Sequence, residues 1–250
     1  MIEKNQRDSD LIIGRNAVTE ALRSGRPIDK ILVARGERSG SVGKIISMCR
    51  DKGIVVKEVD LKKLDFMCPH TSHQGVVAVA AACEYSSVDD IFALAEERNE
   101  KPFIIICDDI EDPHNLGAII RTAECAGAHG VIIPKRHGAG LTYIVGKTSA
   151  GAIEHLPVAR VSNLASTIKE LKDKGVWIYG ADMNGTDYTK TDFSGSVGLV
   201  IGSEGKGIGH LIRENCDFIV SIPLMGKISS LNASVAAGVL MYEVARNRNS

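Results

Sequence analysis

The stretch Ile222–Arg248 reads IPLMGKISSLNASVAAGVLMYEVARNR. A strand-like run, DFIVSIPL, leads into it, and after a Gly-Lys turn the apolar residues follow helical spacing, which predicts a helix over 231–247. Small hydrogen-bonding side chains occupy the start of this pattern at Ser229, Ser230, Asn232 and Ser234. Capping a helix takes one or two such residues. Four of them indicate that the start of the helix faces a polar ligand.

The second half of the chain alternates between strand and helix patterns. Continuous apolar runs predict strands at 103–107, 130–134, 176–181, 198–202 and 218–223. Helical patterns lie between them at 115–127, 142–153, 163–174 and 207–213. Runs of this kind are typical of a parallel sheet covered by helices on both faces. Ligands of such sheets bind at the carboxyl ends of the strands, so we expect the site in the loops that follow them.

The first half predicts a smaller α/β unit. Helical patterns at 16–25, 41–53 and 60–67 alternate with strand patterns at 30–34, 54–59 and 75–81. The segment that follows, CEYSSVDDIFALAEERNEKP, reads as a charged helix leading to Pro102 and is interpreted as a linker. We therefore predict a small domain over 1–83, a linker over 84–101 and a larger domain over 102–250.

Composition narrows the class of protein. The chain has 250 residues, 44% of them hydrophobic and 24% charged, as in ordinary globular proteins. No apolar run approaches the roughly 20 residues of a membrane span, and the polar N-terminus has no apolar segment typical of a secretory signal. Six cysteines without a C-x-x-C pair indicate reduced, mostly buried thiols and a cytoplasmic protein, with neither disulfides nor zinc.

The charges divide unevenly along the chain. The formal net charge of the whole chain is −1, but residues 1–82 carry 14 Lys and Arg against 10 Asp and Glu. This mildly basic front is consistent with a substrate-gripping module joined to a second module, although an excess of four charges also arises by chance. Its candidate substrate contacts are Arg15, Arg23, Arg26, Arg35, His73 and Gln74.

The loop after the first strand of the second half contains DPHNLGAIIR, residues 112–121. Asn115 is read either as a helix cap or as a site residue, and Gly117 in the first turn indicates close approach of another segment. Arg121 lies six residues after Asn115, or about 600° around a helix, so the two side chains leave on different faces. A solvated surface charge is the simpler alternative for Arg121.

The loop after the strand at 198–202 reads GSEGKGIG, residues 202–209. Its spacing matches neither G-x-G-x-x-G nor a phosphate-binding P-loop, and it carries a carboxylate, Glu204. Exposed main-chain groups suit an adenosine-like ligand better than a phosphate. A second glycine-containing turn, DMNGTDY, follows the strand at 176–181.

Taken in order, these segments resemble a known family. The set N-x-G-x-x-x-R, then G-S-E-G-x-G, then I-P followed by S-L-N-x-S-x-A resembles the three motifs of the SpoU (TrmH) class of RNA ribose methyltransferases in the SPOUT superfamily. The resemblance covers 103–246 closely. The segments IIGRNAVTEALRSG and HQGVVAVA are similar to the N-terminal substrate-binding domain of bacterial 23S rRNA guanosine 2′-O-methyltransferases.

The resemblance implies a fold and a chemistry. It implies a catalytic domain with a deep trefoil knot, a homodimer, and S-adenosylmethionine as the cofactor, without a metal. The catalytic residues that it implies are Asn115, Arg121, Glu204, Ser230 and Asn232. The cofactor-binding residues that it implies are Gly180, Ala181, Gly202, Gly205, Ile222, Leu224 and Leu231.

The reaction implied is methylation of a ribose 2′-oxygen. Arg121 is either a base or a charged clamp for alkoxide or phosphate, and the high pKa of arginine favours the clamp. A guanosine of 23S rRNA is the expected target, with tRNA as the alternative substrate. A non-catalytic RNA-binding relative is a second alternative, which the intact set of catalytic residues disfavours. A generic nucleotide-binding α/β enzyme is disfavoured because neither phosphate-loop spacing occurs.

Overall fold

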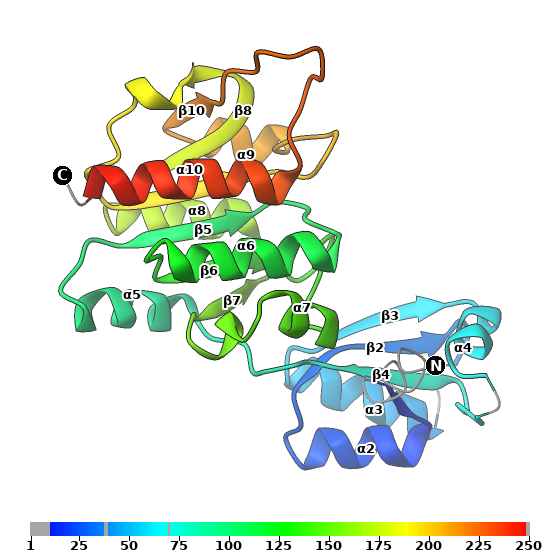
Figure 1. Ribbon diagram of the computed structural model, residues 1–250. Coiled ribbons are helices and arrows are strands. Elements are labelled where there is room, and N and C mark those ends of the chain that lie inside the picture. Colours follow the sequence, from blue (N-terminus) through cyan, green and yellow to red (C-terminus); the bar gives the residue numbers. More distant parts are fainter. Residues whose placement is uncertain (1–10, 38–39, 70, 249–250) are drawn as a thin grey trace. The chain divides into compact units, whose positions relative to one another are not determined.

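The computed structural model describes residues 11–37, 40–69 and 71–248, and the chain divides into two compact units (Figure 1). Unit 1 comprises the chain up to Glu84 together with Leu141–Tyr143. Unit 2 comprises Tyr85–Gly140 and the chain from Ile144 onward. The division falls at the start of the segment that the sequence predicts as a linker.

Unit 1 is built on a four-stranded sheet. Its strands are β1 (Leu11–Ile13), β2 (Ile28–Ala34), β3 (Val55–Val59) and β4 (Val76–Ala80), and its helices are α2 (Arg15–Arg23), α3 (Gly40–Asp51) and α4 (Leu61–Met67). The strand order is β1-β4-β2-β3, with β2 and β3 parallel and the other pairs antiparallel. Apolar residues of α2 and α3 form a core on one face, and Leu64 of α4 packs on the other. The predicted helices and strands are present, whereas three-residue β1 is too short to leave a pattern.

Unit 2 is built on six parallel strands, five of which the apolar runs predict. Its strands are β5 (Phe103–Cys107), β6 (Gly130–Pro134), β7 (Val158–Val161), β8 (Trp177–Asp187), β9 (Val197–Ile201) and β10 (Phe218–Ser221). The order is β10-β8-β9-β5-β6-β7, so β9 and β5 lie at the centre. The sequence did not predict β7, because Arg160 interrupts its short apolar run.

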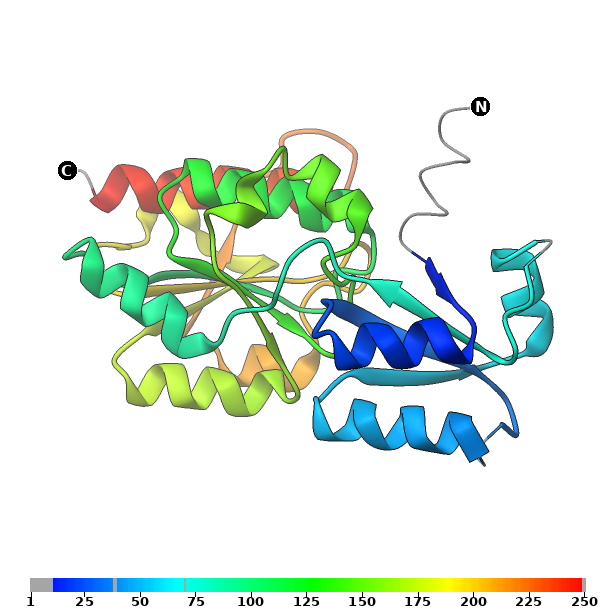
Figure 2. The same ribbon diagram turned by 90° about the horizontal axis from the view of Figure 1, so that it is seen from below.

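Helices cover both faces of this sheet, as Figures 1 and 2 show. The helices after Glu84 are α5 (Val88–Glu97), α6 (Pro113–Cys125), α7 (Tyr143–Thr148), α8 (Leu164–Asp173), α9 (His210–Asn215) and α10 (Ala233–Arg248), with 3-10 turns η1 (Ala152–Glu154) and η2 (Tyr188–Lys190). Helices α5, α8 and α9 pack on one face, and their apolar side chains share a core with the strands. Helices α6, α7 and α10 lie on the other face.

The segment predicted as a linker is mostly helix. Helix α5 begins at a capping box in which Ser87 and Asp90 exchange hydrogen bonds, and it occupies most of 84–101. Its Ile91 is fully buried and lies so close to Gly130 of β6 that a Cβ there would sit 2.4 Å from the Ile91 side chain. The charged composition indicates a linker, but the apolar stripe of α5 packs it into the core of unit 2.

Two features at the β10 edge shape the region where ligands of parallel sheets bind. Strand β8 pairs with β10 up to Gly180, bulges, and pairs again from Thr186. A Cβ on Gly185, inside this bulge, would meet the backbone of Ile219 at 2.6 Å, so only glycine fits. After β10 the chain crosses back over the sheet, and α10 packs beside α6.

Candidate active site

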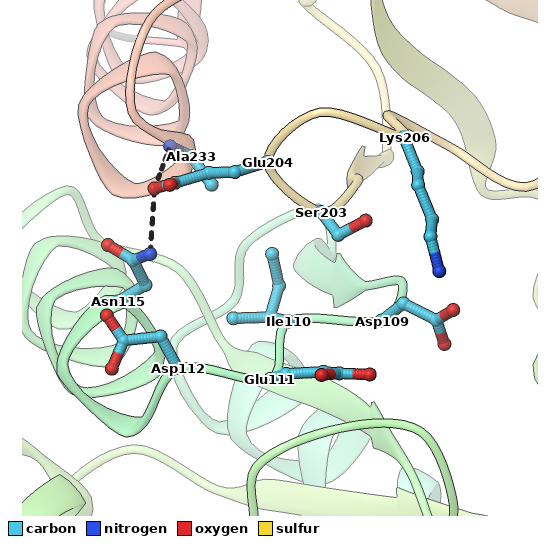
Figure 3. A pocket seen from close by; sticks show the side chains of 9 residues that line it. All are labelled: Asp109, Ile110, Glu111, Asp112, Asn115, Ser203, Glu204, Lys206 and Ala233. Carbon is cyan, nitrogen blue, oxygen red and sulfur yellow. Dashed lines mark hydrogen bonds between the residues drawn. The ribbon is translucent and has the colours of Figure 1, made fainter.

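Loops from three elements meet at the carboxyl edge of the parallel sheet (Figure 3). They are the segment after β5, the glycine-rich loop after β9, and the residues that lead into α10. Together they line a cavity of about 240 Å³. The lining residues are Asp109, Ile110, Glu111, Asp112, Asn115, Ser203, Glu204, Lys206 and Ala233. The site thus lies where the parallel-sheet rule predicts it.

Three of the five predicted catalytic residues join in one hydrogen-bond network. Asn115 donates from Nδ2 to Oε1 of Glu204 at 2.9 Å, and Asn232 donates from its own Nδ2 to the same oxygen. Asn232 also donates to Oδ1 of Asn115 at 2.9 Å, and the backbone N–H of Ala233 reaches Oε1 of Glu204 at 3.3 Å. Side chains from the three loops are therefore held in one arrangement.

Asn115 is not the residue that starts its helix. Asp112 is the N-cap of α6, where its side chain accepts a hydrogen bond from the His114 N–H at 2.9 Å, and Pro113 follows in the first turn. Because Asp112 caps the helix, the Asn115 amide is left to reach Glu204. The expected close approach at Gly117 is present, since a Cβ there would lie 1.8 Å from Oγ1 of Thr148.

The predicted helix over 231–247 begins two residues later than expected, and Asn232 is its cap. Oδ1 of Asn232 accepts hydrogen bonds from the backbone N–H groups of Ser234 and Val235 and from the Ser234 hydroxyl. One amide side chain therefore caps α10 with its oxygen and holds Glu204 with its nitrogen. Ser229 and Ser230 lie in the exposed loop before the helix and form no hydrogen bond with a described residue.

The glycine-rich loop folds tightly back on itself. Ser203 and Gly207 exchange two backbone hydrogen bonds, of 3.1 and 2.9 Å. A Cβ on Gly202 would lie 2.1 Å from the backbone of Gly207, so glycine is required there by packing. Gly205, by contrast, has a φ of 83° with no neighbour within 4 Å of a Cβ. The loop presents main-chain groups to solvent, as the sequence indicates.

Asp108 ties this loop to β5, a role that the sequence did not reveal. Its Oδ2 accepts a hydrogen bond from the N–H of Gly209, at the start of α9, at 2.7 Å. Burial raises the pKa of Asp108, the Gly209 hydrogen bond lowers it, and the neighbouring Asp109 raises it further. Asp108 lies four residues before the DPHN segment, and the sequence does not distinguish it from the other acidic residues there.

A second carboxylate ties α9 to the strand on the other side. Asp182, in the bulge of β8, pairs with Arg213 of α9 at 2.6 Å and accepts the Asn184 N–H at 2.9 Å. Burial raises the pKa of Asp182, but the Asn184 hydrogen bond and the Arg213 charge outweigh burial and leave it below its usual range. Helix α9 is thus anchored to both neighbours of β9.

Arg121 lies apart from the network. It is exposed on α6, and none of the residues described forms a hydrogen bond or ion pair with it. The expectation that Asn115 and Arg121 leave different faces of the helix agrees with this position. Within one chain, the structure brings neither Arg121 nor Ser230 to Glu204.

The predicted cofactor residues come from three segments at this same edge. Gly180 is buried at the end of the first half of β8, and Ala181 follows it in the bulge. Gly202 and Gly205 belong to the glycine-rich loop, and the others lie in the exposed segment between β10 and α10. These are Ile222, Leu224 and Leu231, of which Leu224 and Leu231 are partly exposed apolar side chains.

Five of the six predicted RNA contacts in unit 1 fall into two groups. Arg23 and Arg26 are exposed, and Arg35 forms an exposed ion pair with Asp60. Arg15 and Gln74 instead bind each other, because Nε of Arg15 donates to the Gln74 carbonyl at 2.8 Å and Gln74 Oε1 accepts the Arg15 backbone N–H.

His73 is buried and is not available as a surface contact. Its Nδ1 accepts the Gly75 N–H at 3.0 Å, so Nε2 carries the proton that bonds Asp65 at 2.9 Å. The loop position of His73 suggested exposure, but both ring nitrogens are used inside unit 1.

Metal-binding clusters and membrane-spanning helices are both absent from the described part of the chain. Over residues 11–37, 40–69 and 71–248, no three His, Cys, Asp or Glu side chains gather closely enough to hold a metal ion. Over the same residues, no helix has the length and apolar content needed to cross a membrane.

Comparison with known proteins matches each half of the chain to a family model. The model of the SpoU rRNA Methylase family matches residues 102–242, and the model described as RNA 2′-O ribose methyltransferase substrate binding matches residues 11–86. The Bacillus subtilis (strain 168) protein YacO, provisionally assigned as a TrmH family tRNA/rRNA methyltransferase, is 52% identical over 241 residues, which are 96% of each chain.

Solved structures agree with this assignment. The SpoU methyltransferase AviRb from Streptomyces viridochromogenes, in complex with S-adenosylmethionine, is 27% identical with a TM-score of 0.61, covering 96% of this chain and 90% of its own. An S-adenosylmethionine-bound rRNA methyltransferase from Sinorhizobium meliloti is 26% identical with a TM-score of 0.58, covering 97% and 90%. The fold and these matches together show that the chain belongs to the SpoU rRNA methylase family.

Proposed function

We propose that this RNA methyltransferase transfers a methyl group from S-adenosylmethionine to a ribose 2′-oxygen in structured RNA, and that a guanosine of 23S rRNA is its target. The network of Asn115, Glu204 and Asn232 in the wall of the cavity carries the proposal. It supplies a carboxylate and two amides, which are suited to hold ribose hydroxyl groups, at the place where adenosine-like ligands of parallel sheets bind.

The residues around the glycine-rich loop fit S-adenosylmethionine. The loop offers main-chain groups, because glycines at 205 and 207 leave its backbone uncovered. Gly180, Ala181, Ile222, Leu224 and Leu231 would complete the site, with leucine side chains for the apolar parts of the ligand. When bound, S-adenosylmethionine supplies a methyl group on a positively charged sulfur. The match to S-adenosylmethionine-bound relatives over nearly the whole chain supports this assignment.

The chain's own residues would position the ribose and favour loss of the hydroxyl proton. Glu204 uses Oε1 for the network, and no described residue donates to its Oε2, which can accept a hydrogen bond from the substrate. Holding the reacting oxygen in line contributes up to about 7–11 kcal/mol in the best cases. Arg121, free of partners among the described residues, would bind phosphate or the developing alkoxide. Ser230 would act from the exposed loop before α10.

A ribosomal substrate is favoured over tRNA by unit 1. The substrate-binding model matches 11–86, and the Sinorhizobium rRNA methyltransferase matches this chain across both units. Arg23, Arg26 and Arg35, which are exposed, are the proposed phosphate contacts. Arg15 and Gln74 form one hydrogen-bonded pair that would meet RNA together. Structured RNA as a substrate also implies the cytoplasm as the place of action.

We also propose a homodimer formed through unit 2. Val235 and Tyr242, seven residues apart on one face of α10, are 51% and 55% exposed. Such a stripe is consistent with an interface. Leu240, another apolar residue of α10, is buried within the unit and does not belong to this stripe. Sedimentation at micromolar concentration measures this directly, and a fully active monomer would contradict it.

The trefoil knot is proposed on the path after β9. The chain runs from central β9 to edge strand β10 and then returns across the sheet to α10 beside α6. Slow unfolding and refolding would support a threaded chain. A native cis-proline would not be the cause, because the described X-Pro bonds are all trans.

One experiment tests the reaction. The purified full chain is incubated with labelled S-adenosylmethionine and either 23S rRNA transcripts or tRNA transcripts, and the modified nucleoside is identified by mass spectrometry. A 2′-O-methylguanosine at one site of the rRNA is expected. Methylation of a base, or of tRNA alone, would overturn the corresponding part of the proposal.

A further inference from the structure

Helix α4 of unit 1 leaves an aromatic side chain in solvent. Its sequence is LKKLDFM, in which Leu64 is fully buried on the sheet and Phe66 is 87% exposed. No aromatic ring or cation packs on Phe66 among the described residues. A single exposed apolar side chain is unremarkable on its own. A role for Phe66 in binding is indicated by the residues around it.

Two lysines flank Phe66 on the same face of α4. Lys62 and Lys63 precede Phe66 by four and three residues, which places all three on neighbouring positions of the helix surface. Both lysines are exposed, and no described residue forms an ion pair with either. Leu61, the other exposed apolar residue of α4, points about 140° away from Phe66. We call Lys62, Lys63 and Phe66 the α4 platform.

The acidic residues next to the α4 platform are already engaged. Asp60 pairs with Arg35 at 3.4 Å, and Asp65 bonds the buried His73 at 2.9 Å. Neither carboxylate forms an ion pair with Lys62 or Lys63, so both ammonium groups are available to a ligand. The face that Phe66 shares with them is both positively charged and aromatic.

The bond between Asp65 and His73 also fixes the helix in place. His73 accepts the Gly75 N–H, and Gly75 leads directly into β4. Leu64 packs beneath α4 among Leu32, Ala34 and Val77 of the sheet. The α4 platform is thus a rigid surface, so binding a ligand there costs little ordering of the protein.

We propose that the α4 platform binds an unpaired base of the RNA substrate, with the base stacked on Phe66 and the adjoining phosphates held by Lys62 and Lys63. This proposal rests on RNA being the substrate. An aromatic ring stacks on any base that is not already stacked in a duplex, and lysines meet the charge of the strand. An apolar protein partner would have to bury two ammonium groups without a counter-charge, which is costly.

The test uses the full chain and two RNA probes without cofactor: a 20-nucleotide hairpin with a six-base unpaired loop, and a blunt duplex of the same stem. Fluorescence anisotropy gives the dissociation constants. Phe66→Ala should weaken hairpin binding about 5- to 100-fold, the range measured for loss of one base–aromatic stack, and leave duplex binding unchanged. Phe66→Trp should restore hairpin binding. Leu61→Ala removes another exposed apolar side chain of the same helix, 55% exposed but on a different face, so it is the matched control and should bind like the unchanged protein.

The lysines have a separate signature. Replacing both lysines by alanine should make the binding of the hairpin less dependent on salt. The slope of log K against log salt should become shallower by about one to two. Equal binding by Phe66→Ala and Leu61→Ala, or an equal loss on hairpin and duplex, would overturn the stacking role. A Phe66→Ala variant that binds RNA normally but changes its sedimentation would assign the surface to a protein partner instead.

Methyl transfer is measured on the same variants at saturating RNA. The rate should match that of the unchanged protein, because the α4 platform lies outside the catalytic network. If neither the unchanged protein nor any variant transfers a methyl group to RNA, the proposed reaction is wrong. The binding comparison still decides the role of Phe66 in that case.

Discussion

Asn115 and Asn232 lie 117 positions apart in the chain, yet their side-chain amides are joined by a 2.9 Å hydrogen bond. Both also donate to the same carboxylate oxygen of Glu204. Because the Asn232 oxygen caps α10, the start of that helix and the DPHN segment cannot move independently. The network therefore couples the position of α10 to the geometry of the cavity.

Glu204→Gln should separate the structural and chemical roles of this carboxylate. Glutamine keeps one oxygen that can accept from both asparagines, but its other terminal group becomes a donor. We expect thermal stability to stay within a few degrees of the original, and single-turnover methyl transfer to fall about 10²- to 10³-fold. Glu204→Ala is the comparison, and it should lose the network as well, at about 1 kcal/mol of stability. Normal transfer by the glutamine variant would contradict a role for the second oxygen.

Gly202 and Gly205 form a matched pair for testing the glycine-rich loop. A Cβ on Gly202 would overlap the backbone of Gly207 at 2.1 Å, so Gly202→Ala must displace the loop. We expect this variant to lose S-adenosylmethionine binding by calorimetry. Gly205→Ala meets no neighbour and carries only the cost of its φ of 83°, about 1–2 kcal/mol, so binding should be largely kept. Equal losses in the two variants would indicate that flexibility matters instead of packing.

Several parts of this molecule could be predicted from the sequence, because they depend on local patterns. The apolar runs identify five of the six parallel strands, and the strand ends identify the edge that carries the site. The union of Asn115, Glu204 and Asn232 follows only from the family motifs. No local pattern relates residues 117 positions apart.

Other parts could not be predicted, because tertiary contacts decide them. Because Ile91 is buried, the segment predicted as a linker packs into unit 2. His73 is held inside unit 1 because both of its ring nitrogens form hydrogen bonds there. Asp108 was one acidic residue among several, and only the approach of the Gly209 N–H distinguishes it.

Asp108→Asn should change how stability depends on pH. Burial raises the pKa of Asp108 in the folded protein, so the folded state binds more protons than the unfolded state between the ordinary aspartate pKa and the raised value. This group therefore makes the protein less stable as pH rises through that window. Asparagine keeps the acceptor for the Gly209 N–H without titrating.

We accordingly expect Asp108→Asn to gain stability relative to the unchanged protein as pH rises from about 4, where free aspartate titrates. Urea unfolding followed by the fluorescence of Trp177, the only tryptophan of the chain and a residue of unit 2, measures the difference. Asp108→Ala, which loses the acceptor, should in addition weaken S-adenosylmethionine binding. A difference in stability that is constant with pH would contradict the raised pKa.

Arg121 can act as a clamp or as a base, and lysine distinguishes the two. Arg121→Lys keeps the positive charge but loses the planar fork, and its reference pKa of about 10.4 is within experimental reach. If Arg121 clamps phosphate or alkoxide with two N–H groups, lysine should be nearly as poor as alanine at every pH, with a loss of about 2–4 kcal/mol. If Arg121 removes the hydroxyl proton, the lysine variant should instead gain activity steeply as pH rises. Its exposed position favours the clamp, because the planar guanidinium is open to solvent and pairs with none of the described residues, so both of its N–H groups are available to a phosphate or alkoxide. Single-turnover methyl transfer between pH 6 and 10, with cofactor binding checked separately, decides between them. Near-normal transfer by Arg121→Lys at high pH would reject the clamp.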